Sequence, residues 1–93
     1  MTSTEPRRVA VDGELTIMTA AEQLDRLLGA LRGSNGLRVD LSGVEDLDTA
    51  GLQVLLVARR EADRLHLPFE LGPAGEVVAA ALAIAGLGAA EVN

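Results

Sequence analysis

The stretch LRVDLSGVEDLDTAGLQVLLVARREA, residues 37–62, changes its hydrophobic pattern halfway along. Leu37, Val39 and Leu41 alternate with polar residues, which is typical of a strand with one buried face. From Thr49 or Ala50 onward the apolar residues recur at three- and four-residue spacing, as in an amphipathic helix. The stretch is therefore predicted to form a strand, a short acidic loop and a helix that ends near residue 65.

The flanking sequence extends this strand–loop–helix unit in both directions. Residues 7–17, RRVAVDGELTI, predict two short strands joined at Asp12-Gly13, because Asp-Gly favours a hairpin turn. A helix is predicted over residues 20–31, with Thr19 as its N-cap and Glu22 completing a capping box. Residues 67–72 predict a strand, and Pro73 is expected to open a last helix. Strands separated by helices predict an α/β domain with a mostly parallel sheet and helices chiefly on one face. We expect residues 1–7 to form a flexible tail and residues 8–90 the domain.

The composition excludes several classes of function. The chain has 93 residues, no cysteine and a formal net charge of −6. Without a basic stripe to neutralise phosphates, nucleic acid is not an expected partner. The longest apolar run, residues 77–90, is shorter than the roughly 20 residues that a membrane span requires. We expect a cytoplasmic protein that does not insert into a membrane.

The residues of the chain offer little for catalysis. The only histidine, His66, stands at a predicted helix end, where a histidine more often interacts with the helix dipole or faces solvent than acts as the base of a triad. The acidic residues of the central stretch could attract Mg²⁺, but they lack the spacing of an EF-hand. The chain contains neither a P-loop nor a G-x-G-x-x-G motif. We therefore expect no enzymatic activity, no metal and no cofactor.

Thr49 leaves two interpretations open at the start of the second helix. Either Thr49 or Asp48 could cap the helix by accepting a bond from a free N–H group. A phosphoryl group on Thr49 would add about −1.5 to −2 charges at a helix end that tolerates anions, although neighbouring aspartates would repel it. Ala50 and Gly51 leave the approach to the hydroxyl open. Farther along the helix, polar residues and Val57 group away from the predicted core face, which indicates a surface for a partner.

The chain resembles the STAS domain, a family found in anti-sigma-factor antagonists and in the tails of sulfate transporters. The central stretch resembles the core of that domain, VDGELTIMTAAEQL its N-terminal hairpin and first helix, and GPAGEVVAAALAIAGL its closing helix. The resemblance covers about residues 8–88. It implies a single small domain with a mixed four- to five-stranded sheet and helices packed mainly on one face.

The resemblance also implies a function. In family antagonists the hydroxyl after the aspartate accepts a phosphoryl group from a serine kinase that doubles as the anti-sigma factor. Thr49 matches this acceptor. The expected partner-binding residues are Asp48, Thr49, Ala50, Gln53, Val57 and Arg60.

Two departures keep an alternative open. Thr16 stands where antagonists often have aspartate, and Ala50 replaces the second serine of their usual Ser-Ser-Gly. The Asp-Thr form also resembles the STAS subunit of phospholipid-transporting ABC systems, and the DTAGLQ run resembles STAS proteins encoded beside chemotaxis genes. In these two the protein would be a constitutive adaptor for an ATPase or a signalling complex.

Overall fold

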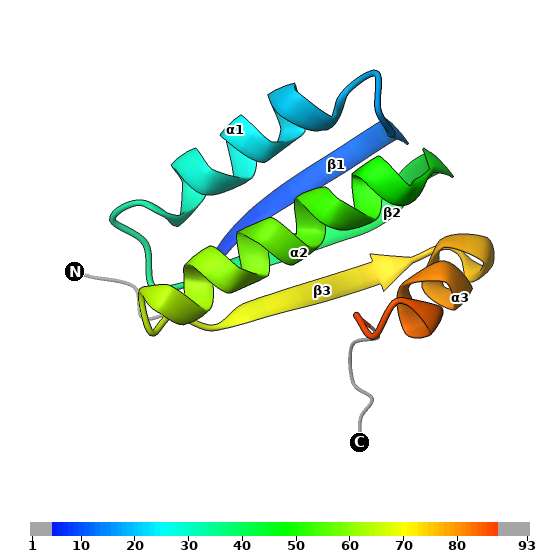
Figure 1. Cartoon of the computed structure of the whole chain (residues 1–93). Helices are drawn as coiled ribbons and strands as arrows, with labels where there is room; N and C mark the ends of the chain where they lie inside the picture. Colours follow the sequence, from blue (N-terminus) through cyan, green and yellow to red (C-terminus); the bar gives the residue numbers. More distant parts are fainter. Residues whose placement is uncertain (1–4, 88–93) are drawn as a thin grey trace.

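The computed structural model describes residues 5–87, which form one α/β unit (Figure 1). Along the chain the elements are β1 (Arg7–Leu15), α1 (Ala20–Leu31), β2 (Leu37–Leu47), α2 (Thr49–Arg64), β3 (Phe69–Ala74) and α3 (Glu76–Ile84). The strand order in the sheet is β1-β2-β3, and both pairs of neighbours are parallel. The parallel pairing follows from the helical connections, since parallel strands need such crossovers.

The hairpin expected at Asp12-Gly13 is wrong. Residues 7–15 form one strand whose two halves both pair in parallel with β2. Gly13 does adopt a positive φ of 75°, and the register shifts on either side of it. Asp12-Gly13 is therefore an irregularity that bends the strand without reversing it. The four to five strands of the expected mixed sheet are not confirmed, because residues 5–87 contain three, all parallel.

The two faces of the sheet differ in polarity. Alternate residues of β1 and β2 are fully buried beneath α1 and α2, which lie on the same face of the sheet (Figure 1). The core consists of aliphatic side chains, among them Val11, Leu15, Leu27, Leu37, Val39, Leu41 and Leu55. The opposite face carries polar residues, including an exposed ion pair of 2.8 Å between Arg38 and Glu70. Parallel sheets usually have both faces covered, and here the polar residues of the opposite face allow it to remain exposed.

Helix α1 begins at Ala20, as expected, but its capping box is not formed. The Thr19 hydroxyl donates to the Glu14 carbonyl at 3.0 Å, and no side chain caps the helix. Helix α3 begins at Glu76, so the expectation that Pro73 opens it is wrong. Pro73 lies in β3, which is an edge strand and therefore tolerates a residue without an N–H group.

Helices α2 and α3 end in the same way. At the end of α3, Gly86 has φ 79° and the Leu87 N–H donates to the Leu82 carbonyl at 2.8 Å. At the end of α2, His66 takes the corresponding position with φ 59°, and the Leu67 N–H donates to the Ala62 carbonyl at 2.8 Å. These are Schellman motifs, in which glycine is the usual residue with positive φ. His66 thus holds a backbone conformation that is strained for a residue with a side chain.

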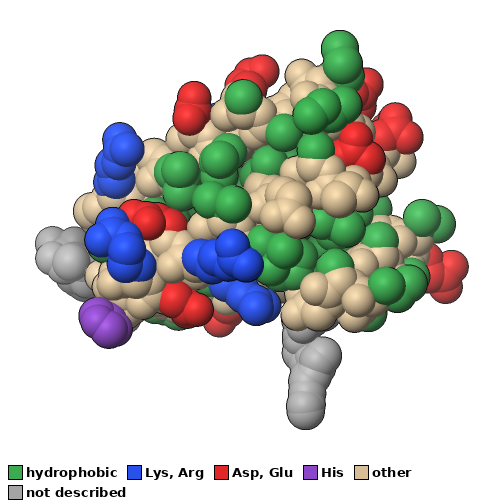
Figure 2. Space-filling model, viewed as in Figure 1, with side chains coloured by type: hydrophobic (Ala, Val, Ile, Leu, Met, Phe, Trp, Pro, Cys, Tyr) green, Lys and Arg blue, Asp and Glu red, His purple; other side chains and the backbone are tan. Residues whose placement is uncertain are grey.

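Charge is distributed unevenly along the strand direction. The chain's arginines stand at positions 7, 8, 26, 32, 38, 59, 60 and 64. These positions belong to the beginnings of β1 and β2, the middle and end of α1 and the second half of α2. The end of the domain where the strands finish and α1 and α2 begin therefore has acidic residues without arginine (Figure 2). We refer to this end, which includes Glu14, Glu22, Asp46 and Asp48, as the acidic end.

Within residues 5–87 no helix has both the length and the apolar character needed to cross a membrane.

Candidate functional site

Thr49 is the first residue of α2, and its side chain is exposed. The cap of the helix is Asp48, whose Oδ1 accepts from the Gly51 N–H at 3.0 Å. The interpretation of Thr49 as the cap is therefore wrong, because the preceding carboxylate already fills that role. Among residues 5–87 the Thr49 hydroxyl has no hydrogen-bond partner, which leaves it free for chemistry or for a partner.

Asp48 makes a second bond that sequence reasoning missed. Its Oδ2 accepts from the Ile17 N–H at 3.0 Å, across the gap to the loop that joins β1 and α1. The N–H groups of Ile17 and then Gly51 lower the pKa of Asp48 below its ordinary value, because hydrogen bonds to a carboxylate favour its charged form. One carboxylate thus joins the start of α2 to residues 16–19.

Gly51 allows α2 to start directly beside β1. A Cβ atom on Gly51 would collide with the Leu15 carbonyl oxygen and press on the Leu47 side chain. The Asp48 N–H also donates to that Leu15 carbonyl, at 3.4 Å. The position of Thr49 is therefore fixed by close backbone packing against the end of the sheet.

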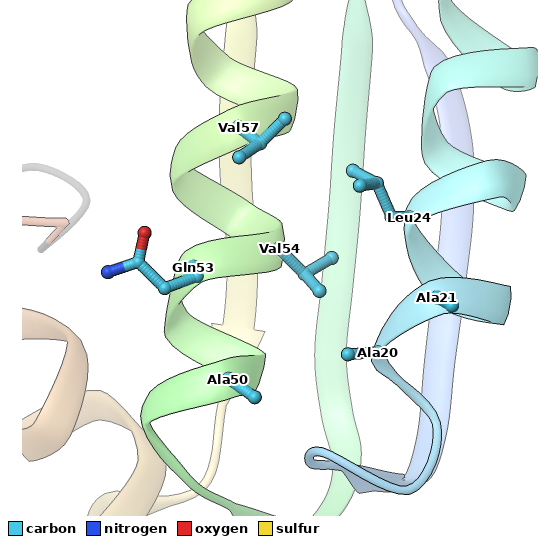
Figure 3. Close-up of a pocket in the computed structure, with 7 residues that line it drawn as sticks. All are labelled: Ala20, Ala21, Leu24, Ala50, Gln53, Val54 and Val57. Carbon is cyan, nitrogen blue, oxygen red and sulfur yellow. The ribbon is translucent and has the colours of Figure 1, made fainter.

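An apolar groove of about 340 Å³ lies between α1 and α2, and its lining on α2 begins at Ala50, the residue after Thr49. Figure 3 shows Leu24 of α1 and Val54 of α2 directed toward one another, whereas the Gln53 amide points away from α1. The lining residues are Ala20, Ala21, Leu24, Ala50, Gln53, Val54 and Val57. Small side chains at three of these positions leave the space between the helices open. A groove lined almost entirely by apolar groups suits an aliphatic side chain of another protein better than a polar ligand.

The structure brings most of the predicted partner-binding residues together. Ala50, Gln53 and Val57 line the groove, and Asp48 and Thr49 precede them at the start of α2. Arg60 is exposed one turn beyond Val57, outside the groove lining. The six residues therefore lie along α2 and its N-cap, with Asp48 and Thr49 at one end and Arg60 toward the other.

Sequence reasoning missed the contribution of α1 and of the loop before it. Ala20 and Ala21 give no signal as single residues, and the helical spacing of Leu24 with Leu27, Leu28 and Leu31 indicates a buried helix face rather than a groove. Ile17 and Met18 are 71% and 83% exposed in the loop after β1. Two adjacent large apolar residues between a strand and a helix start are the signal that could have indicated a surface. We call Ile17 and Met18 the apolar tip.

The acidic residues do not form a metal site in the part of the chain that the structure describes. No three histidine, aspartate or glutamate side chains of residues 5–87 lie close enough together to hold an ion. Asp40, which belongs to the acidic stretch, instead accepts from the Ser42 N–H at 2.9 Å and from its hydroxyl at 2.7 Å. These bonds lower the pKa of Asp40.

Comparison with known proteins gives a family match and two similar structures. A family model described as "Mlab, STAS domain" matches residues 2–91. The unphosphorylated form of the anti-sigma factor antagonist SpoIIAA is similar with a TM-score of 0.77 and 18% identity, covering 95% of this chain and 78% of that one. A sulfate transporter family protein from Wolinella succinogenes is similar with a TM-score of 0.71 and 18% identity, covering 87% of this chain and 66% of that one. No curated protein sequence matches the chain.

Proposed function

The chain belongs to the STAS domain family, and we propose that it is a non-catalytic regulator that binds a protein partner at the start of α2 and loses that partner when Thr49 is phosphorylated. STAS domains are generally non-catalytic and act through protein–protein contacts. The observation that carries the proposal is the exposed hydroxyl of Thr49, which has no hydrogen-bond partner among residues 5–87 and directly precedes Ala50 of the apolar groove. In this proposal the groove and the apolar tip form the docking surface.

The similarity to an anti-sigma factor antagonist supports a partner of the serine/threonine kinase type. In the proposed reaction the Thr49 Oγ1 attacks the γ-phosphorus of ATP held by that kinase. The new O–P bond replaces the bond to the β-phosphate oxygen, ADP leaves, and the hydroxyl proton passes to a base of the kinase. This chain supplies only the acceptor hydroxyl.

A phosphoryl group at Thr49 would weaken docking for a physical reason. The phosphate would stand at the edge of an apolar groove and next to Asp48, where binding requires it to lose water. Desolvation and like-charge repulsion both oppose a contact at such a place. The fold itself would persist, because a helix N-terminus tolerates an anion.

The test compares three proteins produced with an affinity tag in the native host: the wild type, Thr49→Asp and Thr49→Asn. Thr49→Asn matches the shape of the aspartate without its charge. We expect an ATP-binding kinase to be retained by the wild type and by Thr49→Asn but lost from Thr49→Asp, with similar thermal midpoints for all three. Intact-mass measurement should show one phosphoryl group on a fraction of the wild type. Equal retention of the kinase by Thr49→Asp and Thr49→Asn would contradict the proposal.

A constitutive adaptor is the second candidate. Both the Mlab description of the family model and the similarity to a sulfate transporter family protein favour a link to transport. In this case the groove would bind an ATPase subunit of a phospholipid transporter, or a component of a chemotaxis complex, permanently. Thr49→Ala would then lower affinity, and no phosphorylated form would be present in cells.

A further inference from the structure

The loop that carries the apolar tip is tied to α2 through one side chain. Within residues 16–19 the hydrogen bonds are local: the Met18 N–H donates to the Thr16 hydroxyl at 3.2 Å, and the Thr19 N–H donates to the Thr16 carbonyl at 3.0 Å. The bond that reaches α2 runs from the Ile17 N–H to Asp48 Oδ2, at 3.0 Å. In the described part of the chain, the carboxylate of Asp48 is thus the hydrogen-bonded link between this loop and the residues beside Thr49.

The same carboxylate competes with any anion attached to Thr49. Asp48 Oδ1 occupies the Gly51 N–H, one of the free donors in the first turn of α2. A phosphate on the adjacent residue would seek the same donors, since helix N-terminal N–H groups are the usual ligands of phosphate. The two anions would also repel each other at this short separation. A change at Thr49 would therefore act first on Asp48.

We propose that Asp48 transmits the state of Thr49 to the apolar tip. When Thr49 is unmodified, Asp48 holds the Ile17 N–H and fixes the loop, so that Ile17 and Met18 stand beside the groove as one docking surface. When Thr49 is phosphorylated, the phosphate takes the Gly51 N–H, Asp48 releases the Ile17 N–H, and the tip loses its fixed position. This regulation rests on the proposed function, because it describes how the same surface would be switched.

Asparagine at position 48 separates the two bonds of Asp48. Its single oxygen can still accept from the Gly51 N–H and cap α2, but its NH₂ group cannot accept from the Ile17 N–H. Asp48→Asn should therefore release the loop without adding charge at Thr49. Asp46→Asn is the matched control, because Asp46 is an exposed neighbour whose carboxylate accepts no hydrogen bond from residues 5–87.

The test follows the backbone amide of Ile17 by NMR in the ¹⁵N-labelled full chain. We expect its hydrogen exchange to accelerate about tenfold or more in Asp48→Asn and in Thr49→Glu, the factor for loss of a charge-assisted hydrogen bond. In the same two variants the amide chemical shifts of Ile17 and Met18 should both change. The amide should stay as in the wild type in Asp46→Asn and in Thr49→Gln, which has the size of glutamate without its charge. Unchanged exchange at Ile17 in Thr49→Glu would overturn the coupling.

Failure of this coupling can be told apart from failure of the proposed function. A Thr49→Glu protein that loses its kinase while Ile17 keeps its wild-type exchange overturns the coupling and leaves the partner switch standing. A Thr49→Glu protein that releases Ile17 and still retains the kinase supports the coupling and overturns the switch. Asp48→Asn adds an independent check, since its released loop should weaken kinase retention with Thr49 unmodified.

Discussion

Gly51 packs against the carbonyl group of Leu15 so closely that even a methyl group on Gly51 would overlap the carbonyl oxygen. This contact joins the first turn of α2 to the last residue of β1. Because Thr49 and the loop after Leu15 lie on either side of it, the contact determines how the candidate site is assembled. Its importance can be measured directly.

Gly51→Ala should destabilise the domain although alanine favours helix. Overpacking of this kind usually costs about 1–3 kcal/mol, and a clash with a backbone carbonyl that cannot rotate away belongs to the upper part of this range, above the roughly 1 kcal/mol by which alanine is the better helix former. Urea unfolding followed by circular dichroism should show a lower free energy of unfolding. An unchanged or raised value would mean that α2 can move away from Leu15 at little cost.

Gly29→Ala, on α1, should stabilise the domain, in contrast to Gly51→Ala. A Cβ atom on Gly29 would meet no other atom within 4 Å, and the residue is exposed within the helix. The free energy of unfolding should therefore rise by about 0.5–1 kcal/mol from helix propensity alone. The same urea experiment measures it, and the contrast in sign with Gly51→Ala isolates the effect of the contact with Leu15.

His66→Gly should stabilise the domain. His66 has φ 59° at the end of α2, where a side chain costs about 1 kcal/mol and glycine costs little. The greater freedom of glycine in the unfolded chain offsets part of this gain. Thermal and urea unfolding should show a net increase of about 0.5 kcal/mol. Gly86→Ala, at φ 79° in the equivalent position of α3, should change stability in the opposite direction.

Asp48 should make stability depend on pH in the acid range. Hydrogen bonds to the Ile17 and Gly51 N–H groups lower its pKa in the folded state. Its contribution is therefore complete above the ordinary aspartate pKa of about 3.9, and it is lost as the pH falls through the lower folded-state value. The wild type should be more stable than Asp48→Asn at neutral pH, and the difference should shrink in acid. A difference that stays constant down to pH 2 would contradict this assignment of the charge.

The apolar tip should matter for binding and hardly at all for stability. Ile17 and Met18 are 71% and 83% exposed, so Ile17→Ser and Met18→Ser should change the free energy of unfolding by less than about 0.5 kcal/mol. Leu15→Ala, only two residues away but fully buried, should cost about 2–5 kcal/mol. Both serine variants should retain less kinase in the native host. Full retention would remove the tip from the docking surface.

The sequence predicts α1 and the central β2–α2 unit well, because each rests on a local signal, whereas the start of α3 is misplaced. The switch from alternation in β2 to helical spacing in α2 marks both elements, and the start of α1 at Ala20 is confirmed. The Asp12-Gly13 pair is misleading because glycine supplies a positive φ equally well to a hairpin turn and to an irregularity within a strand. Which of the two forms is decided by pairing with β2, a contact between residues some 30 positions apart.

The candidate site is harder to predict than the fold. The position of Thr49 on α2 follows from the sequence, and so do Ala50, Gln53 and Val57 of the groove, whereas Val54 on the same helix was not predicted. The other wall of the groove comes from α1, and its depth depends on how far apart two helices stand. Likewise, Asp48 is recognisable as a possible cap, but its bond to Ile17 crosses 31 positions and depends on the close packing at Gly51.

All the arginines lie away from the acidic end, and this distribution of charge has a kinetic consequence. A partner drawn to the acidic end over long range must carry positive charge, and its association rate should fall steeply as salt screens that attraction. A phosphate on Thr49 would strengthen the same field, so it would not slow the encounter with such a partner. Loss of binding after modification would therefore appear as faster dissociation, with an association rate as high as before or higher.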